Sequence, residues 1–164
     1  SDDVPNFLRS MLNQYAVDIM PGEYTFREHT SGGPIDKTYE ESCFLERLRN
    51  MLVMEDGHSL WLARATPRAW LEQGKRISIR DAPTHFGVVA YEIVSDIDNG
   101  RITADVDLPS RNPPSVVLLR LRHPKAAPIR SVTVNGDPSS AFASEKELVI
   151  LEGFNGPVTV RVDY

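Results

Sequence analysis

The spacing of apolar positions along this chain changes near residue 57. Before that point, apolar residues recur every three or four positions, which is the period of an amphipathic helix. After it, apolar and polar residues alternate, as they do along a strand with one buried face. The pattern predicts a mainly β protein with an N-terminal helical segment, namely two α-helices followed by an antiparallel β-sandwich. The predicted domains are residues 1–57 and 58–164.

The first predicted helix has Asp3 as its N-cap and Pro5 in its first turn, positions that these residue types favour. Pro21 and Gly22 end it. Its apolar side chains fall on one face, which is formed by Val4, Phe7, Leu8, Met11, Leu12, Tyr15, Ala16 and Ile19.

The second predicted helix runs from Asp36 to Asp56, where Gly57 ends it. Cys43 lies beside its apolar stripe, so we expect a buried and unreactive thiol. The stripe consists of Tyr39, Phe44, Leu48, Met51 and Leu52.

Short strands with turn sequences between them fill the rest of the chain. A helical turn over residues 66–73 carries Trp70, and Asn135-Gly136 is typical of a tight hairpin. Since no long helix interrupts the strands, they favour a sandwich. We predict strands over residues 58–65, 76–80, 88–95, 101–108, 116–122, 130–134, 147–151 and 158–163.

Two apolar helix faces need a covering, because each large side chain left in water forgoes roughly 1.5–3 kcal/mol. The helices can cover the sandwich, pair with a second copy of the chain as a homodimer, or pack on a larger helical domain. We favour the third arrangement, since the chain begins at Ser1 directly before a helix. On this expectation the chain is a piece of a longer protein.

Several segments occur in a characteristic order: residues 45–57 (LERLRNMLVMEDG), 60–65 (LWLARA), 66–71 (TPRAWL), 82–87 (APTHFG) and 132–136 (VTVNG). This order resembles the junction in bacterial glycoside hydrolases built on a six-hairpin α/α toroid with a C-terminal β-sandwich, rhamnosidase-like in general layout. The resemblance implies that residues 1–57 are the last toroid helices. It also implies an accessory part of a carbohydrate-active enzyme that is inactive by itself.

In such enzymes a pair of carboxylates performs the acid and base steps. The resemblance implies Glu28 as a catalytic residue, in the loop between the two helices. Tyr24, His29 and Trp61 would then bind substrate, because aromatic rings cover the apolar faces of sugars. The alternatives are an ordinary loop acid at Glu28, and tryptophans at 61 and 70 that pack where helices and sandwich meet.

Composition excludes some other functions. The net charge is −5 and no run of Lys and Arg forms a basic patch, so we predict no nucleic-acid partner. No apolar stretch reaches the roughly 18 residues of a membrane span, and no cofactor motif occurs. The histidines lack metal-ligand spacing, and no metal is predicted. Arg120 and Arg122 are two positions apart on one predicted strand, so their side chains should point to the same face. We expect that face to be exposed to solvent.

The expected partner is carbohydrate, bound through the full-length enzyme. The alternative function is a stand-alone, non-catalytic β-sandwich that binds carbohydrate or another protein. The single cysteine, Cys43, leaves the compartment open, with export from a bacterium as the preferred interpretation.

Overall fold

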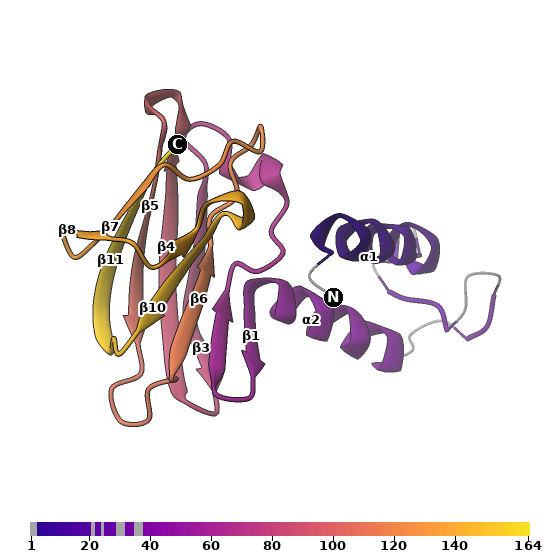
Figure 1. The fold of residues 1–164 in the computed structure, drawn as a ribbon. Coiled ribbons are helices and arrows are strands. Elements are labelled where there is room, and N and C mark those ends of the chain that lie inside the picture. The colour runs from indigo at the N-terminus through magenta and orange to yellow at the C-terminus, as the bar shows by residue number, and fades with distance from the viewer. Residues whose placement is uncertain (1–2, 21, 24, 29–31, 35–37) are drawn as a thin grey trace. The chain divides into compact units, whose positions relative to one another are not determined.

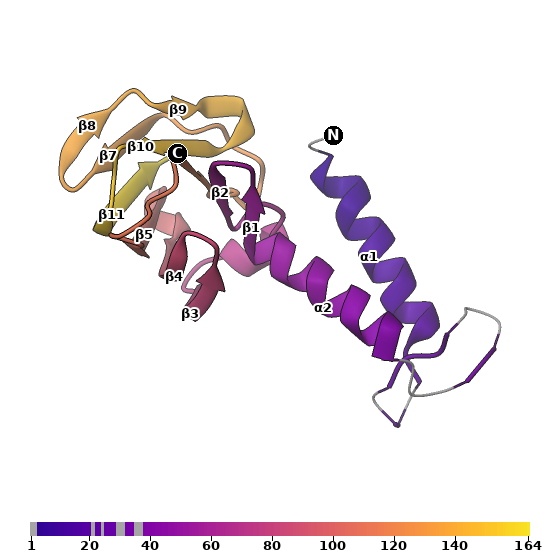
Figure 2. The ribbon, with the colours of Figure 1, turned by 90° about the horizontal axis from the view of Figure 1, so that it is seen from below.

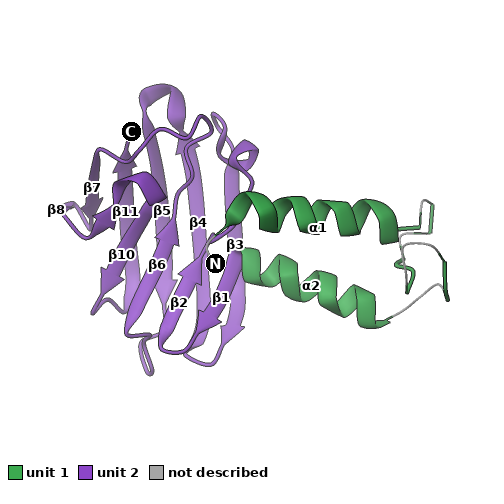
Figure 3. Cartoon of the chain, turned by 45° about the vertical axis from the view of Figure 1, so that its right-hand side comes forward, with its two compact units in different colours: residues 1–51 green, residues 52–164 purple. Residues whose placement is uncertain are grey.

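The computed structural model describes residues 3–20, 22–23, 25–28, 32–34 and 38–164. Two compact units make up the chain, residues 1–51 and 52–164 (Figure 3). Each unit is described by itself below. Tyr24 and His29, two of the predicted substrate-binding residues, lie outside the described residues.

The helical unit contains α1 (Val4–Asp18) and most of α2 (Thr38–Leu52). The predicted N-cap is confirmed, because the Asp3 carboxylate accepts a hydrogen bond from the Asn6 amide at 3.1 Å. Neither helix is long and apolar enough to cross a membrane, which holds for every helix among the described residues.

The helical unit buries very few side chains. The buried residues among those described in the range 1–51 are Val4, Asp18, Phe26 and Met51. Large apolar side chains of both helices are instead exposed, with 64% of Leu12, 72% of Tyr39 and 62% of Leu45 accessible. Most members of the apolar stripes predicted from the sequence are half-buried, and Leu12, Tyr15, Ala16 and Tyr39 are exposed.

The sandwich unit consists of two sheets (Figures 1 and 2). The five-stranded sheet has the order β1 (Val53–Asp56), β2 (Ser59–Leu62), β6 (Val116–Arg120), β10 (Leu148–Glu152) and β9 (Phe142–Ala143). The six-stranded sheet has the order β3 (Arg76–Thr84), β4 (Gly87–Asp96), β5 (Arg101–Leu108), β11 (Gly156–Asp163), β7 (Ser131–Val134) and β8 (Asp137–Ser139). Three short 3-10 helices, Arg68–Leu71, Ile97–Asn99 and Ser144–Lys146, join some of these strands.

The predicted fold class, two helices followed by a β-sandwich, is confirmed. Every named strand pair is antiparallel except β2 and β6, which run parallel. The Asn135-Gly136 hairpin is also confirmed: it joins β7 to β8, and both residues have positive φ, 52° and 91°.

The predicted end of the second helix is wrong. The helix stops at Leu52, and Val53–Asp56 forms β1, which pairs with Ser59–Leu62 across a tight turn at Gly57. The side chains of Val53 and Leu60 are buried there, so tertiary burial overrides the helical pattern. The unit boundary accordingly falls after Met51.

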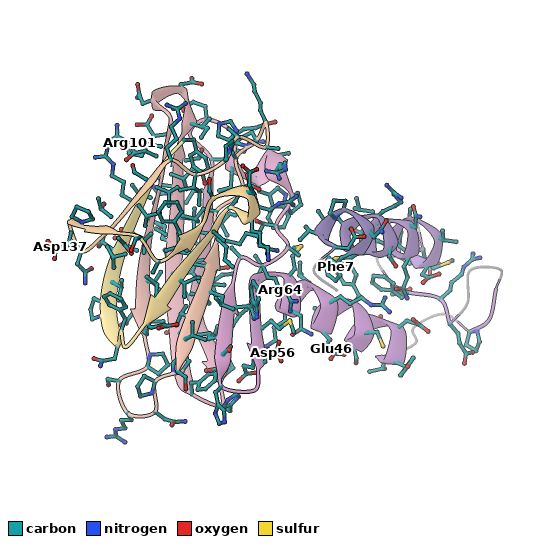
Figure 4. The ribbon with its side chains drawn as sticks, viewed as in Figure 1. Phe7, Glu46, Asp56, Arg64, Arg101 and Asp137 are labelled. Atoms are coloured by element: carbon teal, nitrogen blue, oxygen red, sulfur yellow. The ribbon has the colours of Figure 1, made fainter. Side chains whose placement is uncertain are left out.

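The two sheets enclose one apolar core. Figure 4 draws the side chains of the described residues on the ribbon. The outer faces of the two sheets differ. On the five-stranded sheet, register places four apolar residues in one line across β1, β2, β6 and β10: Met54, Trp61, Leu118 and Ile150 (the apolar row). The equivalent line across β3, β4, β5 and β11 of the other sheet is Ser78, Glu92, Asp105 and Thr159 (the polar row).

Candidate functional site

Glu28, the predicted catalytic residue, lies in the helical unit just after a short antiparallel bridge between Ile19 and Phe26. Its backbone amide donates to the Pro34 carbonyl at 3.2 Å, and the residue is half-buried. Phe26 anchors this segment by packing against Phe44 with ring centroids 5.2 Å apart. Phe26 also contacts Tyr15, with ring centroids 6.0 Å apart, so the segment is held by backbone pairing and by two aromatic contacts.

A second carboxylate lies on the same bridge and was not predicted from the sequence. Asp18 is the last residue of α1, and its carbonyl accepts from the Arg27 amide at 2.9 Å. The Asp18 side chain is 4% exposed, and its Oδ1 has no hydrogen-bond partner. A carboxylate at the C-terminus of a helix is unfavourable, because it lies at the negative end of the helix dipole. An acid at the end of the first predicted helix was therefore the signal in the sequence that could have indicated Asp18. Asp18 and Glu28 flank the Ile19–Phe26 bridge, and a third acid, Glu23, lies in the turn between the bridged residues, where its amide donates to the Met20 carbonyl at 3.2 Å.

Trp61 lies in β2, within the sandwich unit, and not in the unit that holds Glu28. Two cations approach its ring: the Arg64 guanidinium carbon is 4.5 Å from the ring centroid and that of Arg120 is 5.4 Å away. Such cation–π contacts use part of the ring surface on which a sugar would stack. The substrate-binding role of Trp61 stays a prediction.

The sandwich unit also holds a buried charged cluster that the sequence analysis missed. Arg68 donates to both carboxylate oxygens of Glu147, at 2.6 and 2.7 Å. The same carboxylate accepts from the His123 backbone amide at 2.7 Å. Arg122 donates to the Thr66 carbonyl at 2.7 Å. Arg122 lies close enough to Arg68, Glu147 and Arg120 for the charges of all three to affect its pKa.

The predicted solvent exposure of Arg120 and Arg122 is wrong, since the two residues are only 4% and 7% exposed. Each guanidinium is accommodated by a backbone carbonyl: Arg120 donates to Arg64 at 3.1 Å and Arg122 donates to Thr66. Buried charges need such partners.

Burial and neighbouring charges shift the pKa values of several groups in this cluster. Burial lowers the pKa of Arg122, and Arg68 lowers it further. Burial also lowers the pKa of His123, against an opposing effect of Glu147. The pKa of Tyr164, whose hydroxyl donates to the Leu121 carbonyl, is raised by burial.

These contacts make a structural clamp more than an acid–base site. Donors occupy both oxygens of Glu147, so the carboxylate has no oxygen lacking a donor with which to meet a substrate. The cluster ties the residues before β10 to the 3-10 helix Arg68–Leu71 and to the segment after β6. Bidentate pairing of this kind fixes geometry.

A shallow hollow of about 500 Å³ lies on the outer face of the six-stranded sheet. Ser78, Arg80, Asp105, Asp107 and Thr159 line it. The Thr159 hydroxyl donates to Asp105 at 2.7 Å, so part of its hydrogen-bonding capacity is used internally. Most of the accessible lining is apolar, and these side chains supply its smaller polar part.

The structure also shows the environments of Trp70 and Cys43, two residues for which the sequence predicted burial. Trp70 was expected to be packed and is instead 39% exposed. Cys43 is half-buried, not buried. Within the described parts of the chain, no group of three or more His, Cys, Asp or Glu side chains is arranged to hold a metal ion.

Comparison with known proteins gives little. No family model matches the chain, and no curated protein matches it. One similar solved structure is named "Glycoside hydrolase"; it shares 14% identity and a TM-score of 0.43 over 76% of this chain. This chain covers 20% of the length of that one. A likeness of this size assigns no activity.

Proposed function

We propose that this chain is the C-terminal accessory portion of a carbohydrate-active enzyme, a glycoside hydrolase, and that it supports a catalytic domain without being catalytic alone. The observation that carries the proposal is the apolar row on the outer face of the five-stranded sheet. A sheet that faces water on one side has polar residues there, as the polar row does. The apolar row instead suits a sheet covered by protein on both faces.

The strands themselves support this interpretation. Residues 116–119 and 148–151 are continuous apolar runs, Val-Val-Leu-Leu and Leu-Val-Ile-Leu. Such runs are typical of strands that are buried on both faces. Leu12, Tyr39 and Leu45 of the helices are further apolar side chains that are exposed.

The type of enzyme rests on the sequence resemblance to toroidal glycoside hydrolases described above. In that setting residues 1–51 would continue a larger helical domain. Glu28 would be the catalytic carboxylate, with Tyr24, His29 and Trp61 toward the substrate. Asp18 is a candidate for the second acid that hydrolysis requires.

The test uses the full-length protein encoded by the gene. We expect it to contain a few hundred residues N-terminal to Ser1, and to hydrolyse at least one member of a panel of aryl glycosides. Leu118→Glu, in the apolar row, should place a charge in a dry interface and abolish most of this activity. The matched control is Thr103→Glu, on the outer face of the six-stranded sheet, which should leave the activity unchanged. A gene that starts near Ser1, or equal activity of both variants, contradicts the proposal.

The hollow on the six-stranded sheet favours a second candidate, a module that binds carbohydrate without hydrolysing it. Polar groups such as those of Asp107 and Arg80 can bond to sugar hydroxyls. Titration of the chain with a panel of polysaccharides would then give saturable binding, and a flat response across the panel counts against it.

A further inference from the structure

The strand β3 is the first strand of the six-stranded sheet, and it pairs with β4 alone. The Lys75 carbonyl accepts from the Ser95 amide at 3.0 Å, which fixes the alternation of this antiparallel pair. Ile77 and Ile79 therefore turn their backbone groups toward β4. The amide and carbonyl groups of Arg76 and Ser78 point to the open edge. Residues 76–79 thus form an unpaired edge of β3.

An apolar hollow of about 430 Å³ lies along this edge. Leu52, Trp70, Ile77 and Ile79 supply its apolar wall. Trp70 is 39% exposed although it forms part of this wall. An incoming strand that pairs with Arg76 and Ser78 would direct its alternate side chains to the same side as Ile77 and Ile79, and so into the hollow.

The charges at the edge select the occupant. Arg76, Arg80 and Lys75 are all exposed at or beside the unpaired groups. Arg76 pairs with Glu92 and Lys75 with Glu72, each at 2.8 Å, so a guest carboxylate at those two positions would replace a carboxylate of this chain. A second copy of the chain fits badly, because antiparallel pairing about Ser78 would set Arg76 opposite Arg80, and like charges opposite one another are destabilising. The edge is also short, since a bulge at Arg80 and Asp81 (φ 52°) bends the strand away.

We propose that the unpaired edge of β3 binds an extended acidic segment of another protein chain by strand addition. The guest carries an acidic residue opposite Arg76, an apolar residue opposite Ile77, a small polar residue opposite Ser78, an apolar residue opposite Ile79 and an acidic residue near Arg80. Backbone hydrogen bonds to Arg76 and Ser78 give affinity, and the hollow and the arginines give selectivity. The proposal is independent of whether the chain belongs to a glycosidase.

The probe is a cyclised hairpin peptide, one strand of which reads glutamate, valine, threonine, valine, glutamate. Cyclisation reduces the ordering cost of binding. In the complete chain, the peptide should bind saturably and slow the hydrogen exchange of the Arg76 and Ser78 amides, measured by NMR. The Ile77 amide already bonds within the sheet and should change little.

N-methylation separates strand addition from loose adsorption. A methyl group on the threonine nitrogen, which faces β3 when the peptide pairs antiparallel with Ser78 opposite threonine, should weaken binding at least about tenfold. The control peptide carries the methyl group on a valine nitrogen, which faces away, and should bind as the parent does. Equal affinities of the two methylated peptides would overturn the proposal, as would unchanged edge amides at the solubility limit of the parent peptide.

A charge exchange provides the second arm. Arg80→Glu should weaken the glutamate peptide about tenfold and favour a peptide with lysines in place of its glutamates. Arg130→Glu is the matched control, since Arg130 is also exposed but precedes β7, toward the opposite side of the sheet. If both variants bind the glutamate peptide alike, the edge is not the site.

Discussion

At the scale of single residues, Glu147 has the most demanding environment in the sandwich. It is buried, it adopts a left-handed conformation (φ 52°), and its carboxylate balances the positive charge of Arg68 and its neighbours. Removing the charge would leave several guanidinium groups close together in a poorly solvated place. The pair therefore holds together segments that are distant in sequence.

We expect Glu147→Gln to lower the free energy of unfolding by about 3 kcal/mol, because breaking a buried pair leaves an uncompensated charge. The measurement is urea unfolding at neutral pH. Glu72→Gln is the control: its pair with Lys75 has side chains about half exposed and should be worth less than about 1 kcal/mol. Similar losses in both variants would show that the Glu147 pair has no special role.

His123, in the same cluster, should make stability depend on pH. Burial lowers its pKa below the ordinary 6.5, so between the two values the unfolded chain binds more protons than the folded one. Its contribution to stability is complete above about pH 6.5 and is lost as the pH falls through the lowered pKa.

The expected result is a melting temperature that decreases as the pH falls below about 6.5, with a smaller decrease in His123→Asn. Asparagine removes the titration, and its side-chain oxygen can replace Nδ1, which accepts from the Lys125 amide at 3.0 Å. An identical pH profile in the variant would assign the dependence to other groups.

The residue scale is also where sequence analysis was weakest. Asp3 was placed as a cap because capping is local. Arg120 and Arg122 were misplaced, because alternation says which residues share a face but not whether that face is covered. The partners of Glu147 are 24 to 79 positions away, and no local pattern contains them.

At the scale of elements, most strands could be predicted because turns and alternation delimit them. The strand over 101–108 was predicted with its observed ends. By contrast, β1 was predicted as helix, since its four residues continue the helical period of α2 and become a strand only by pairing with β2. The short β8 and β9 have too few residues to show any period.

The sequences of the strands also indicate which sheet has an apolar outer face. The apolar runs in β6 and β10 already indicated strands covered on both faces, whereas β5 and β11 alternate regularly. The difference between the apolar row and the polar row was thus present in the sequence. What the sequence did not provide was the register that places these side chains in one line.

At the scale of the whole molecule, stability should reside in one of the two units. Every member of the apolar core lies between Val53 and Tyr164, whereas the helical unit has few buried residues among those described. A fragment of residues 52–164 should therefore fold by itself. Its melting temperature should match that of the main transition of the complete chain to within a few degrees.

Calorimetry is the measurement. With roughly 0.7 kcal/mol per residue near 60 °C, a sandwich of this size should absorb on the order of 80 kcal/mol in one transition, with or without residues 1–51. A fragment that melts much earlier, or without a cooperative transition, would show that the helical unit is part of the folding unit.

The place of β11 has a consequence for biosynthesis. This strand lies between β5 and β7, although it is made after both of them. While a ribosome is still adding residues 156–163, the nascent chain exposes an open edge on β5, and the hairpin of β7 and β8 has no neighbour to join. The sheet can close only when its middle strand has left the exit tunnel. A messenger RNA truncated before the codons for residues 156–163 would yield a protein with this open edge, which quality-control proteases should degrade.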